Sequence, residues 1–501
     1  MLLRMLTAVA LLLSFSSAVA AQDAKAVVAA ASKAMGADNL NSITYSGTAR
    51  NGAFGQSKSI GDPMGPVNTT QISGYTRTVT FAPAASPTAL VLRSTGTTQP
   101  PTVPGVPPPM PGQFNQNVTG QQSTDNWGQA LNVWTTPWGF LKAAAANTVS
   151  QRQQGGQQVL SFSPANFKSP SGQMYTVTGY INNQNLVTKV ETRVEDNVVG
   201  DRLVEFEYSN YQNMNGVQVP TRIVQKQAGM ATFDANITAA TPNPAKLAEL
   251  LIPPAPAGRA GGAPGGAPGG QGRGGGGGGQ AAAPAAEKIG DGVFTIGGNY
   301  LSLAVDMGDH ILVVESGQSD QRGMDVMAAA KRAIPNKPIR FVVNSHPHFD
   351  HAGGLATAVA EGATILTHRN NEEALERFLS GPRTLIGDSL AKMPRKPSID
   401  GIGTRDVRRG SNGKIVELHH VPNEHSDGMV VVYLPAEKAL WSADITAVNP
   451  NPGQVASLRA VNDTVSKLKL DYNLFLTAHP SNPDPGRPLT RDDVTKALAT
   501  K

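Results

Sequence analysis

The chain of 501 residues contains no cysteine. It therefore forms no disulfide bond, and its stability must come from the burial of apolar side chains. It also has no cysteine to which a lipid could be attached near the N-terminus, so a lipoprotein anchor is not expected.

Long apolar runs and clusters of like charge are also scarce. Beyond the first residues, no apolar stretch reaches the roughly 20 residues that span a bilayer, so we expect no stable membrane insertion. The formal net charge is only +5, and lysine and arginine form no cluster, which argues against a nucleic-acid partner. A small-molecule substrate is the partner that we expect; the sequence does not indicate an oligomeric state.

The N-terminus has the order of a secretory signal peptide. Arg4 precedes an apolar run from Ala8 to Leu13, and the small residues Ala18-Val19-Ala20 suit a cleavage site. We therefore predict a signal peptide over residues 1–20 and a mature protein that is periplasmic or secreted.

Composition divides the mature chain into two domains. Residues 251–286 consist almost entirely of glycine, proline and alanine and have little to bury, which predicts a flexible linker. It separates an N-terminal domain, residues 21–250, from a C-terminal domain, residues 287–501. The two domains are expected to move as separate bodies.

The N-terminal domain is predicted to be mostly β. A helix is expected over 24–37, and alternating apolar and polar residues indicate strands over 175–184, 186–196, 202–212 and 219–227. Residues 96–125, rich in proline, glutamine and threonine, are expected to form a long loop. The order of a helix, strands and the final YSNYQNMNGVQVPTRI weakly resembles the half-barrels of periplasmic lipoprotein carriers. The domain is expected either to cradle a ligand or to act as a scaffold.

The C-terminal domain alternates segments typical of strands and helices. Strands are expected within 294–316, 339–345, 363–368, 413–421, 428–435, 438–445 and 472–480, and helices over 324–334, 353–361 and 370–381. This mixture predicts an α/β domain in which helices cover sheets.

Histidine is absent from the first three hundred residues, yet the remainder of the chain holds nine. Three of them lie in the segment NSHPHFDHAGG, directly after the apolar strand IRFVV. His346 and His348 are two residues apart, a spacing that lets both side chains converge on one cation, and Asp350 and His351 suit a second position nearby. Imidazole nitrogens and carboxylates are ligands that zinc prefers.

Three further candidates lie where other predicted strands meet loops. His425 precedes the strand GMVVVYLP, Asp444 follows KALWS, and His479 ends YNLFLTAH. Ligands on several strand ends form a rigid cup at one edge of a sheet layer.

Together these residues resemble the metallo-β-lactamase superfamily, over residues 287–501. The resemblance implies an αββα sandwich with a site for two zinc ions per chain at one edge of its sheets. It assigns one ion to His346, His348 and His425, and the second to Asp350, His351 and His479, with Asp444 bridging the two. Ala443 stands where members with a bridging aspartate usually have glycine, so Asp444 has the alternative role of an outer carboxylate. The lactamase subclass with a cysteine ligand is excluded.

The remaining histidines are interpreted differently. His310 and His368 are expected to be structural, and since side chains alternate along a strand, only one of His419 and His420 can face the pocket.

The expected reaction is hydrolysis. Two cations ~3.5–4 Å apart can hold a hydroxide and polarise a carbonyl, and Asp350 is the predicted catalytic residue, which orients the water and handles its proton. Esters, lactones, lactams and thioesters are the expected substrates, and residues 379–401 form the candidate specificity loop. Two alternatives remain: an iron-dependent enzyme of the persulfide-dioxygenase type, and a non-catalytic ligand-binding protein.

Overall fold

The structure, a computed structural model, describes residues 24–102, 108–252, 284–298, 300–479 and 488–499. The predicted signal peptide and most of the predicted linker lie outside these residues. None of the helices in the described ranges combines the length and the apolar character needed to cross a bilayer.

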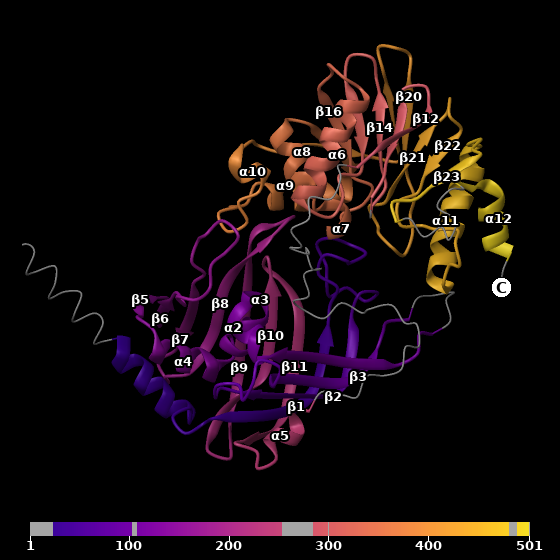
Figure 1. Cartoon of the computed structure of the whole chain (residues 1–501). Coiled ribbons are helices and arrows are strands. Elements are labelled where there is room, and N and C mark those ends of the chain that lie inside the picture. The colour runs from indigo at the N-terminus through magenta and orange to yellow at the C-terminus, as the bar shows by residue number, and fades with distance from the viewer. Residues whose placement is uncertain (1–23, 103–107, 253–283, 299, 480–487, 500–501) are drawn as a thin grey trace, which may run out of the picture.

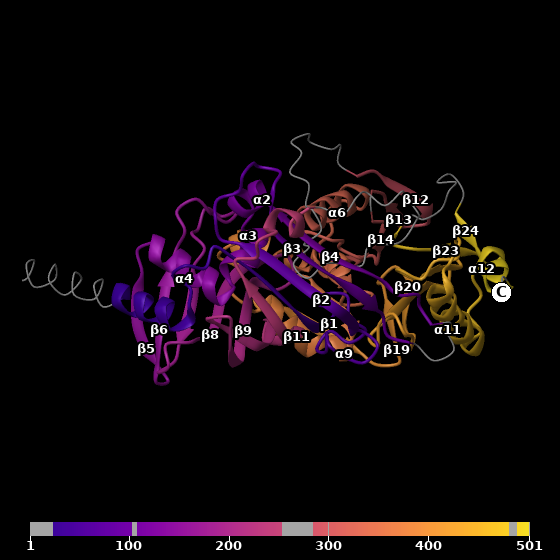
Figure 2. The same cartoon turned by 90° about the horizontal axis from the view of Figure 1, so that it is seen from below.

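The N-terminal domain is built on one antiparallel sheet, ordered β4-β3-β2-β1-β11-β10-β9-β8-β7-β6-β5. Its strands are β1 (Ser42–Asn51), β2 (Thr70–Thr80), β3 (Leu90–Gln99), β4 (Gly112–Thr119), β5 (Ser150–Gln154), β6 (Gln157–Phe162), β7 (Val177–Ile181), β8 (Val187–Asp196), β9 (Gly200–Met214), β10 (Val217–Gln227) and β11 (Met230–Pro242). Figure 2 shows the long strands β1, β2 and β11 crossing the molecule side by side.

Most helices of this domain pack against the sheet. A helix over residues 24–35 leads into it, and four others follow: α2 (Gly120–Asp125), α3 (Trp127–Trp134), α4 (Pro137–Ala146) and α5 (Leu247–Leu250). The side chains of Thr119, Asn126 and Thr136 accept hydrogen bonds from the first turns of α2, α3 and α4 and so fix where these helices begin. The expected loop over 96–125 is therefore wrong in part, because β4 and α2 form within it.

The C-terminal domain is a four-layer αββα sandwich, as predicted. One sheet contains β12 (Ala286–Gly290), β13 (Val293–Ile296), β14 (Ser302–Asp306), β15 (Ile311–Val314), β16 (Ile339–Val343), β17 (Thr364–His368) and β18 (Ser398–Ile402) in that order. The other contains β19 (Arg405–Arg409), β20 (Ile415–His420), β21 (Val430–Leu434), β22 (Ala439–Trp441), β23 (Leu474–Leu476) and β24 (Leu489–Thr490). Apolar side chains of both sheets, including Val314, Val343, Val432 and Trp441, form the core between them.

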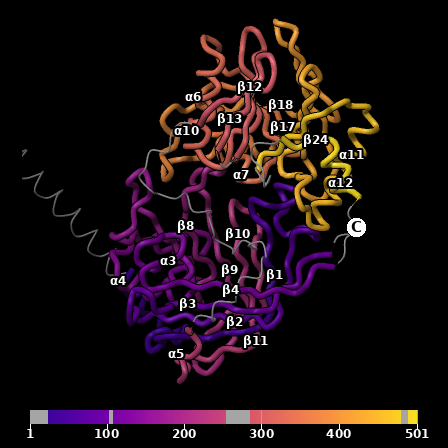
Figure 3. Tube along the Cα trace, turned by 45° about the vertical axis from the view of Figure 1, so that its right-hand side comes forward, coloured from indigo at the N-terminus to yellow at the C-terminus, as the bar shows by residue number. Residues whose placement is uncertain are grey.

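Two groups of helices cover the outer faces of this sandwich. On the first sheet lie α6 (Asp320–Ala333), α8 (Leu355–Glu361), α9 (Arg369–Leu379) and α10 (Ser389–Lys392), and on the second lie α11 (Pro452–Leu468) and α12 (Arg491–Ala499). The short helix α7 (Phe349–Ala352) lies at the base of the domain and faces the N-terminal domain (Figures 1 and 3).

The two domains share an interface, contrary to the expectation of separate bodies. Ile60, Val198 and Val199 of the N-terminal domain are buried in the core formed by α6, α8 and α9. Arg383 donates hydrogen bonds across the interface to the carbonyl oxygens of Asn197 (2.6 Å) and Val198 (3.1 Å). The interface arises from tertiary packing between residues far apart in the chain, which a reading of local composition does not reveal.

Candidate metal centre

The HPHFDH segment follows the buried strand β16 and continues into α7. His346, His348 and His351 are almost fully buried. The chain can turn here because Gly353 packs against another loop: a Cβ on Gly353 would lie 2.2 Å from the carbonyl oxygen of Gln318. The glycine is thus required by close backbone approach, which allows the three histidines to lie at the edge of the sandwich.

The other predicted residues come to the same edge from the second sheet. His425 lies in the loop before β21, Asp444 lies three residues after the end of β22, and His479 lies three residues after the end of β23. Because β22 and β23 are parallel neighbours, the residues that follow them leave the sheet at the same edge. All seven candidate residues are therefore brought together.

These side chains form two groups that have Asp444 in common. The first contains His346, His348, His425 and Asp444, and the second contains Asp350, His351, Asp444 and His479; within each group the potential ligand atoms lie within 4.8 Å of one another.

The two oxygens of Asp444 face different groups. Its Oδ2 lies 3.2 Å from His425 Nε2 and 3.7 Å from His346 Nε2. Its Oδ1 lies 2.6 Å from His351 Nε2 and 3.0 Å from His479 Nε2. A bridging carboxylate needs one oxygen toward each ion, and Asp444 has this orientation.

The buried ring nitrogens indicate that the residues fit a metal. His348 Nδ1 is buried and has no hydrogen-bond partner among the described residues. His351 Nε2 and Asp444 Oδ1 approach closely, yet their contact lacks the angles of a hydrogen bond. Unpaired buried polar atoms are costly, and a cation to which they converge would remove that cost.

In each of the three buried histidines, one ring nitrogen contacts a group outside the two ligand groups. His346 Nδ1 lies 2.9 Å from Ser345 Oγ, and His348 Nε2 lies 3.2 Å from the carbonyl oxygen of Ser57. His351 Nδ1 lies 3.2 Å from Glu315 Oε2. Such partners fix the tautomer and orientation of a ligating histidine.

The electrostatics differ between the two groups. Burial and the neighbouring histidines lower the pKa of His346, and burial lowers that of His348 to about 3, so both rings are neutral at pH 7. In the second group burial is outweighed: the carboxylates of Asp444 and Glu315 raise the pKa of His351 well above its usual value. The nearby carboxylates of Asp350 and Asp444 likewise outweigh burial and raise the pKa of His479 to about 9.

Both carboxylates remain ionised. Although burial opposes it, hydrogen bonding and the charges of nearby histidines lower the pKa of Asp350 and of Asp444. The centre therefore presents ionised carboxylates and imidazoles to a cation.

Glu315 and Tyr300 belong to this centre although the sequence interpretation missed both. Glu315 is buried, has a left-handed φ of 66°, and accepts a 2.9 Å hydrogen bond from the backbone amide of Ser345. Tyr300 donates to Asp350 Oδ2 at 3.4 Å, and its ring centroid lies 4.6 Å from that of His479. A signal for Glu315 did exist: it follows β15, the parallel neighbour of β16, and so lies at the same sheet edge.

The N-terminal domain also reaches the centre, through the loop of residues 52–69 between β1 and β2. Gln56 Nε2 donates a 2.7 Å hydrogen bond to Asp350 Oδ1, and the Phe349 amide donates to the carbonyl oxygen of Gly55 at 2.9 Å. With the Ser57 carbonyl at His348, this loop contacts three consecutive residues of the HPHFDH segment. No pattern in the sequence indicates contacts between segments so far apart.

The remaining histidines lie outside both groups. His310 pairs with Asp309, and His368 stacks on His420 with a ring-centroid distance of 3.9 Å. His419 Nε2 bonds to Glu417. Neither His419 nor His420 belongs to the centre.

Part of the predicted specificity loop, residues 379–401, has a structural role. Arg383 is buried, pairs with Asp388 and contacts the N-terminal domain, so it is not available to a substrate carboxylate. The exposed basic residues of this loop are Lys392, Arg395 and Lys396.

Ala443, directly before Asp444, has a backbone conformation that glycine adopts more readily. Its φ is 46°, in the left-handed region, where a residue with a Cβ is strained by roughly 1–2 kcal/mol. The alanine nevertheless adopts this conformation, and Asp444 keeps its place.

Comparisons with known proteins agree with this geometry. Residues 297–488 match the model of the metallo-beta-lactamase superfamily. The chain is 26% identical over 199 residues to the alpha subunit of 2,4-dinitroanisole O-demethylase from Nocardioides sp., covering 38% of this chain and 54% of that protein. It is 24% identical over 186 residues to a linear primary-alkylsulfatase from Pseudomonas sp., covering 31% of this chain and 35% of the relative. The chain thus spans about half the length of the demethylase subunit and about a third of the length of the alkylsulfatase.

Among solved structures, a metallo-beta-lactamase from Pontibacter korlensis is 16% identical, with a TM-score of 0.33, over 43% of this chain and 97% of that one. The weak resemblance of the N-terminal domain to the half-barrels of periplasmic lipoprotein carriers stays a prediction. The family assignment rests on the matched residues and on the αββα sandwich that they form. The C-terminal domain of this chain belongs to the metallo-β-lactamase superfamily.

Proposed function

We propose that the chain is a zinc-dependent hydrolase that acts on an ester, lactone, lactam or thioester bond. The observation that carries the proposal is the pair of ligand groups with Asp444 in common. His346, His348 and His425 would hold one ion, Asp350, His351 and His479 the other, and Asp444 would bridge them. When bound, a pair of zinc ions lowers the pKa of water to about 7 and polarises a carbonyl oxygen.

The chain's own residues would orient the reacting water and move its proton. Asp350 Oδ1 accepts a hydrogen bond from Gln56, and Oδ2 accepts one from Tyr300. These two hydrogen bonds restrict the rotation of the carboxylate. Because its pKa is lowered, Asp350 is ionised at neutral pH and able to accept a proton. Burial raises the pKa of Tyr300, aided by Asp350 and Asp444, so its hydroxyl stays a donor. These features support a role for Asp350 in passing a proton from water to the leaving group.

Metal analysis of the purified full-length protein, followed by a substrate panel, tests the proposal. Zinc with hydrolysis of one of the four bond types is the expected result. The names of the two relatives add a primary alkyl sulfate and 2,4-dinitroanisole to the panel. Iron with oxygen uptake would instead favour an oxygenase of the persulfide-dioxygenase type. Full metal content with no turnover of any compound would favour the non-catalytic ligand-binding alternative.

Two variants separate ligation from proton transfer. His351→Ala removes only a ligand, so excess zinc is expected to restore part of its activity. Asp350→Ala also removes the proton acceptor, and general acid–base assistance contributes about 10²–10⁴-fold, so zinc is expected to restore less. Turnover measured against added zinc decides this, and equal recovery of the two variants would reduce Asp350 to a ligand.

We also propose that the enzyme acts outside the cytoplasm. The proposal rests on Arg4, the apolar run and Ala18-Val19-Ala20. Mass spectrometry of the protein from the envelope or medium tests it, and a retained Met1 on the exported protein would contradict it.

A further inference from the structure

Arg77, on β2, places a guanidinium inside the N-terminal domain without an acidic partner. It makes no ion pair with any described residue, whereas Arg202 of the same domain pairs with Asp196, and Arg50 with Asp234. Arg77 Nη2 donates to the carbonyl oxygen of Asn132 at 2.6 Å, and Nη1 lies 3.5 Å from Gln116 Oε1. Its Nε is buried and has no partner within the described ranges.

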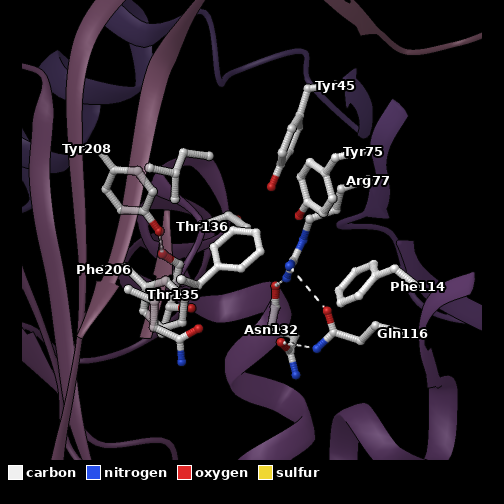
Figure 4. Close-up of a pocket in the computed structure, with 13 residues that line it drawn as sticks. Tyr45, Tyr75, Arg77, Phe114, Gln116, Asn132, Thr135, Thr136, Phe206 and Tyr208 are labelled. Carbon is white, nitrogen blue, oxygen red and sulfur yellow. Dashed lines mark hydrogen bonds between the residues drawn. The ribbon is translucent and has the colours of Figure 1, made fainter. Parts of the chain in front are cut away.

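The guanidinium lies in a chamber whose lining includes six aromatic rings (Figure 4). The rings belong to Tyr45, Tyr75, Phe114, Phe206, Tyr208 and Phe233. Arg77 is the sole cationic side chain among the residues described as lining the chamber, and none of these residues is acidic. Burial raises the pKa of Tyr45 and Tyr208, so these hydroxyls stay neutral and supply no counter-charge.

A second, larger hollow adjoins the chamber. Its volume is about 530 Å³, against about 30 Å³ for the chamber, and both are lined by Asn132, Phe206 and Gln225. A water molecule needs roughly 10–15 Å³ measured in this way, so the chamber takes about two oxygen-sized groups. The larger hollow has the size of a pocket for a small organic molecule.

The charge of Arg77 needs compensation. Arginine keeps its proton in proteins, so it cannot become neutral when it is buried. A buried charge is tolerated when it is paired, and no described residue pairs with Arg77. The unused Nε–H, beside an Nη, forms one edge of the planar fork that matches the two oxygens of a carboxylate.

We propose that the N-terminal domain binds an organic monocarboxylate, with its carboxylate on Arg77 and its apolar body beside Phe206 in the larger hollow. One cation in an otherwise neutral, aromatic chamber matches a single negative charge. Within the larger hollow, the rings of Trp127, Phe167 and Tyr175 lie with Phe206 among the lining residues and would contact the body of the ligand. The rest of that lining is largely polar and includes two acidic and two basic residues, Asp125, Glu195, Lys168 and Arg202. The polar side chains of Asn132, Gln116 and Gln225 would surround the head of the ligand in the chamber. This site is separate from the metal centre, since none of its residues belongs to either ligand group, and it does not depend on the proposed hydrolysis.

Isothermal titration of the zinc-loaded full-length protein tests the proposal with matched pairs of probes. The pairs are 1-naphthaleneacetate with 1-naphthaleneacetamide, and decanoate with decanamide. Within each pair the body is the same and only the charge differs. We expect the acid of at least one pair to bind at least tenfold more tightly than its amide. Equal binding of acid and amide in both pairs, or no binding of either acid, would overturn the proposal without any variant.

Variants then locate the site. Arg77→Gln is expected to abolish the preference for the acid, and Arg77→Lys to keep part of it. Arg93→Gln is the matched control, because Arg93 lies on the neighbouring strand β3, also makes no ion pair with a described residue, and lines neither hollow. The Arg93→Gln variant should bind each acid and each amide with the affinity of the wild type.

The metal centre is the competing location for a carboxylate. His346→Ala should therefore leave acid binding intact. Binding that is lost in His346→Ala and retained in Arg77→Gln would place the carboxylate at the metal and overturn the proposal. A change in near-UV circular dichroism of Arg77→Gln would identify a folding defect, in which case the wild-type comparison of acid with amide decides.

Discussion

Glu315→Gln is the substitution that most directly tests how the second ligand group is held. Glu315 uses both carboxylate oxygens: Oε1 accepts from the Ser345 amide at 2.9 Å, and Oε2 lies 3.2 Å from His351 Nδ1. Glutamine has the same shape but only one acceptor oxygen. Whichever way its amide is turned, an NH₂ group faces either the Ser345 N–H or the imidazole N–H. One of the two hydrogen bonds must therefore be lost.

The expected size of the effect follows from the burial of this contact. Glu315 and His351 are each only 1% exposed, so water cannot replace the missing bond. A hydrogen bond to a charged group contributes about 1.5–3 kcal/mol, which is roughly a 10- to 150-fold change in an equilibrium constant. Partners of this kind typically alter metal affinity by about 10–100-fold. We therefore expect zinc affinity at the second group to fall by one to two orders of magnitude.

Competition with a chromophoric chelator measures this affinity. The first zinc equivalent, held by His346, His348 and His425, should bind as in the wild type, and the second should be displaced at lower chelator concentration. Glu361→Gln is the control, because Glu361 pairs with Lys331 at the surface and should leave both equivalents unchanged. Wild-type affinity of both ions in Glu315→Gln would refute the role assigned to Glu315.

Three further outcomes are expected. The pKa values of His351 and His479 are raised (to about 9 for His479), so both rings are protonated in the metal-free protein at pH 7. Zinc binding at pH 7 should therefore release about two protons, and fewer as the pH rises past 9. An indicator dye measures the protons released. Gln56→Ala should lower kcat about 2- to 10-fold with unchanged zinc content, because an exposed hydrogen bond contributes roughly 0.5–1.5 kcal/mol; unchanged kcat would contradict it. Arg383→Met should reduce the free energy of unfolding by about 3–5 kcal/mol, since Asp388 is left buried and unpaired, which urea denaturation followed by fluorescence checks.

The sequence was informative about the metal centre because its pattern is local. His346, His348, Asp350 and His351 are adjacent and follow an apolar strand, so their convergence could be expected before the fold was known. Glu315 and Tyr300 are single residues in ordinary segments, and their proximity to the centre depends on strand order and loop packing. The alternation of strand-like and helix-like segments predicted only that helices cover sheets, and the αββα sandwich followed from the resemblance that these ligands carry.

The N-terminal domain was harder to predict. Its strands from β7 to β10 show clear alternation, but α3 and α4 lie in a segment whose short helices depend on the caps Asn126 and Thr136 and on packing against the sheet. The contacts of residues 52–69 with the metal centre are tertiary and leave no trace in composition. Residues 251–286 indicated two domains, but the composition of a linker carries no information about the surfaces that it connects.

The interface between the domains has a consequence for the intact polypeptide. The loop of residues 52–69 and the Arg383 contacts join the two parts independently of the chain between residues 252 and 284. Arg259 and Arg273 in that segment are trypsin sites by sequence. Cleavage there would produce a two-chain protein whose fragments co-elute and retain the metal centre. The N-terminal fragment would then behave as a subunit that complements the fragment with the two ligand groups, and separately expressed halves should reconstitute the two-chain protein.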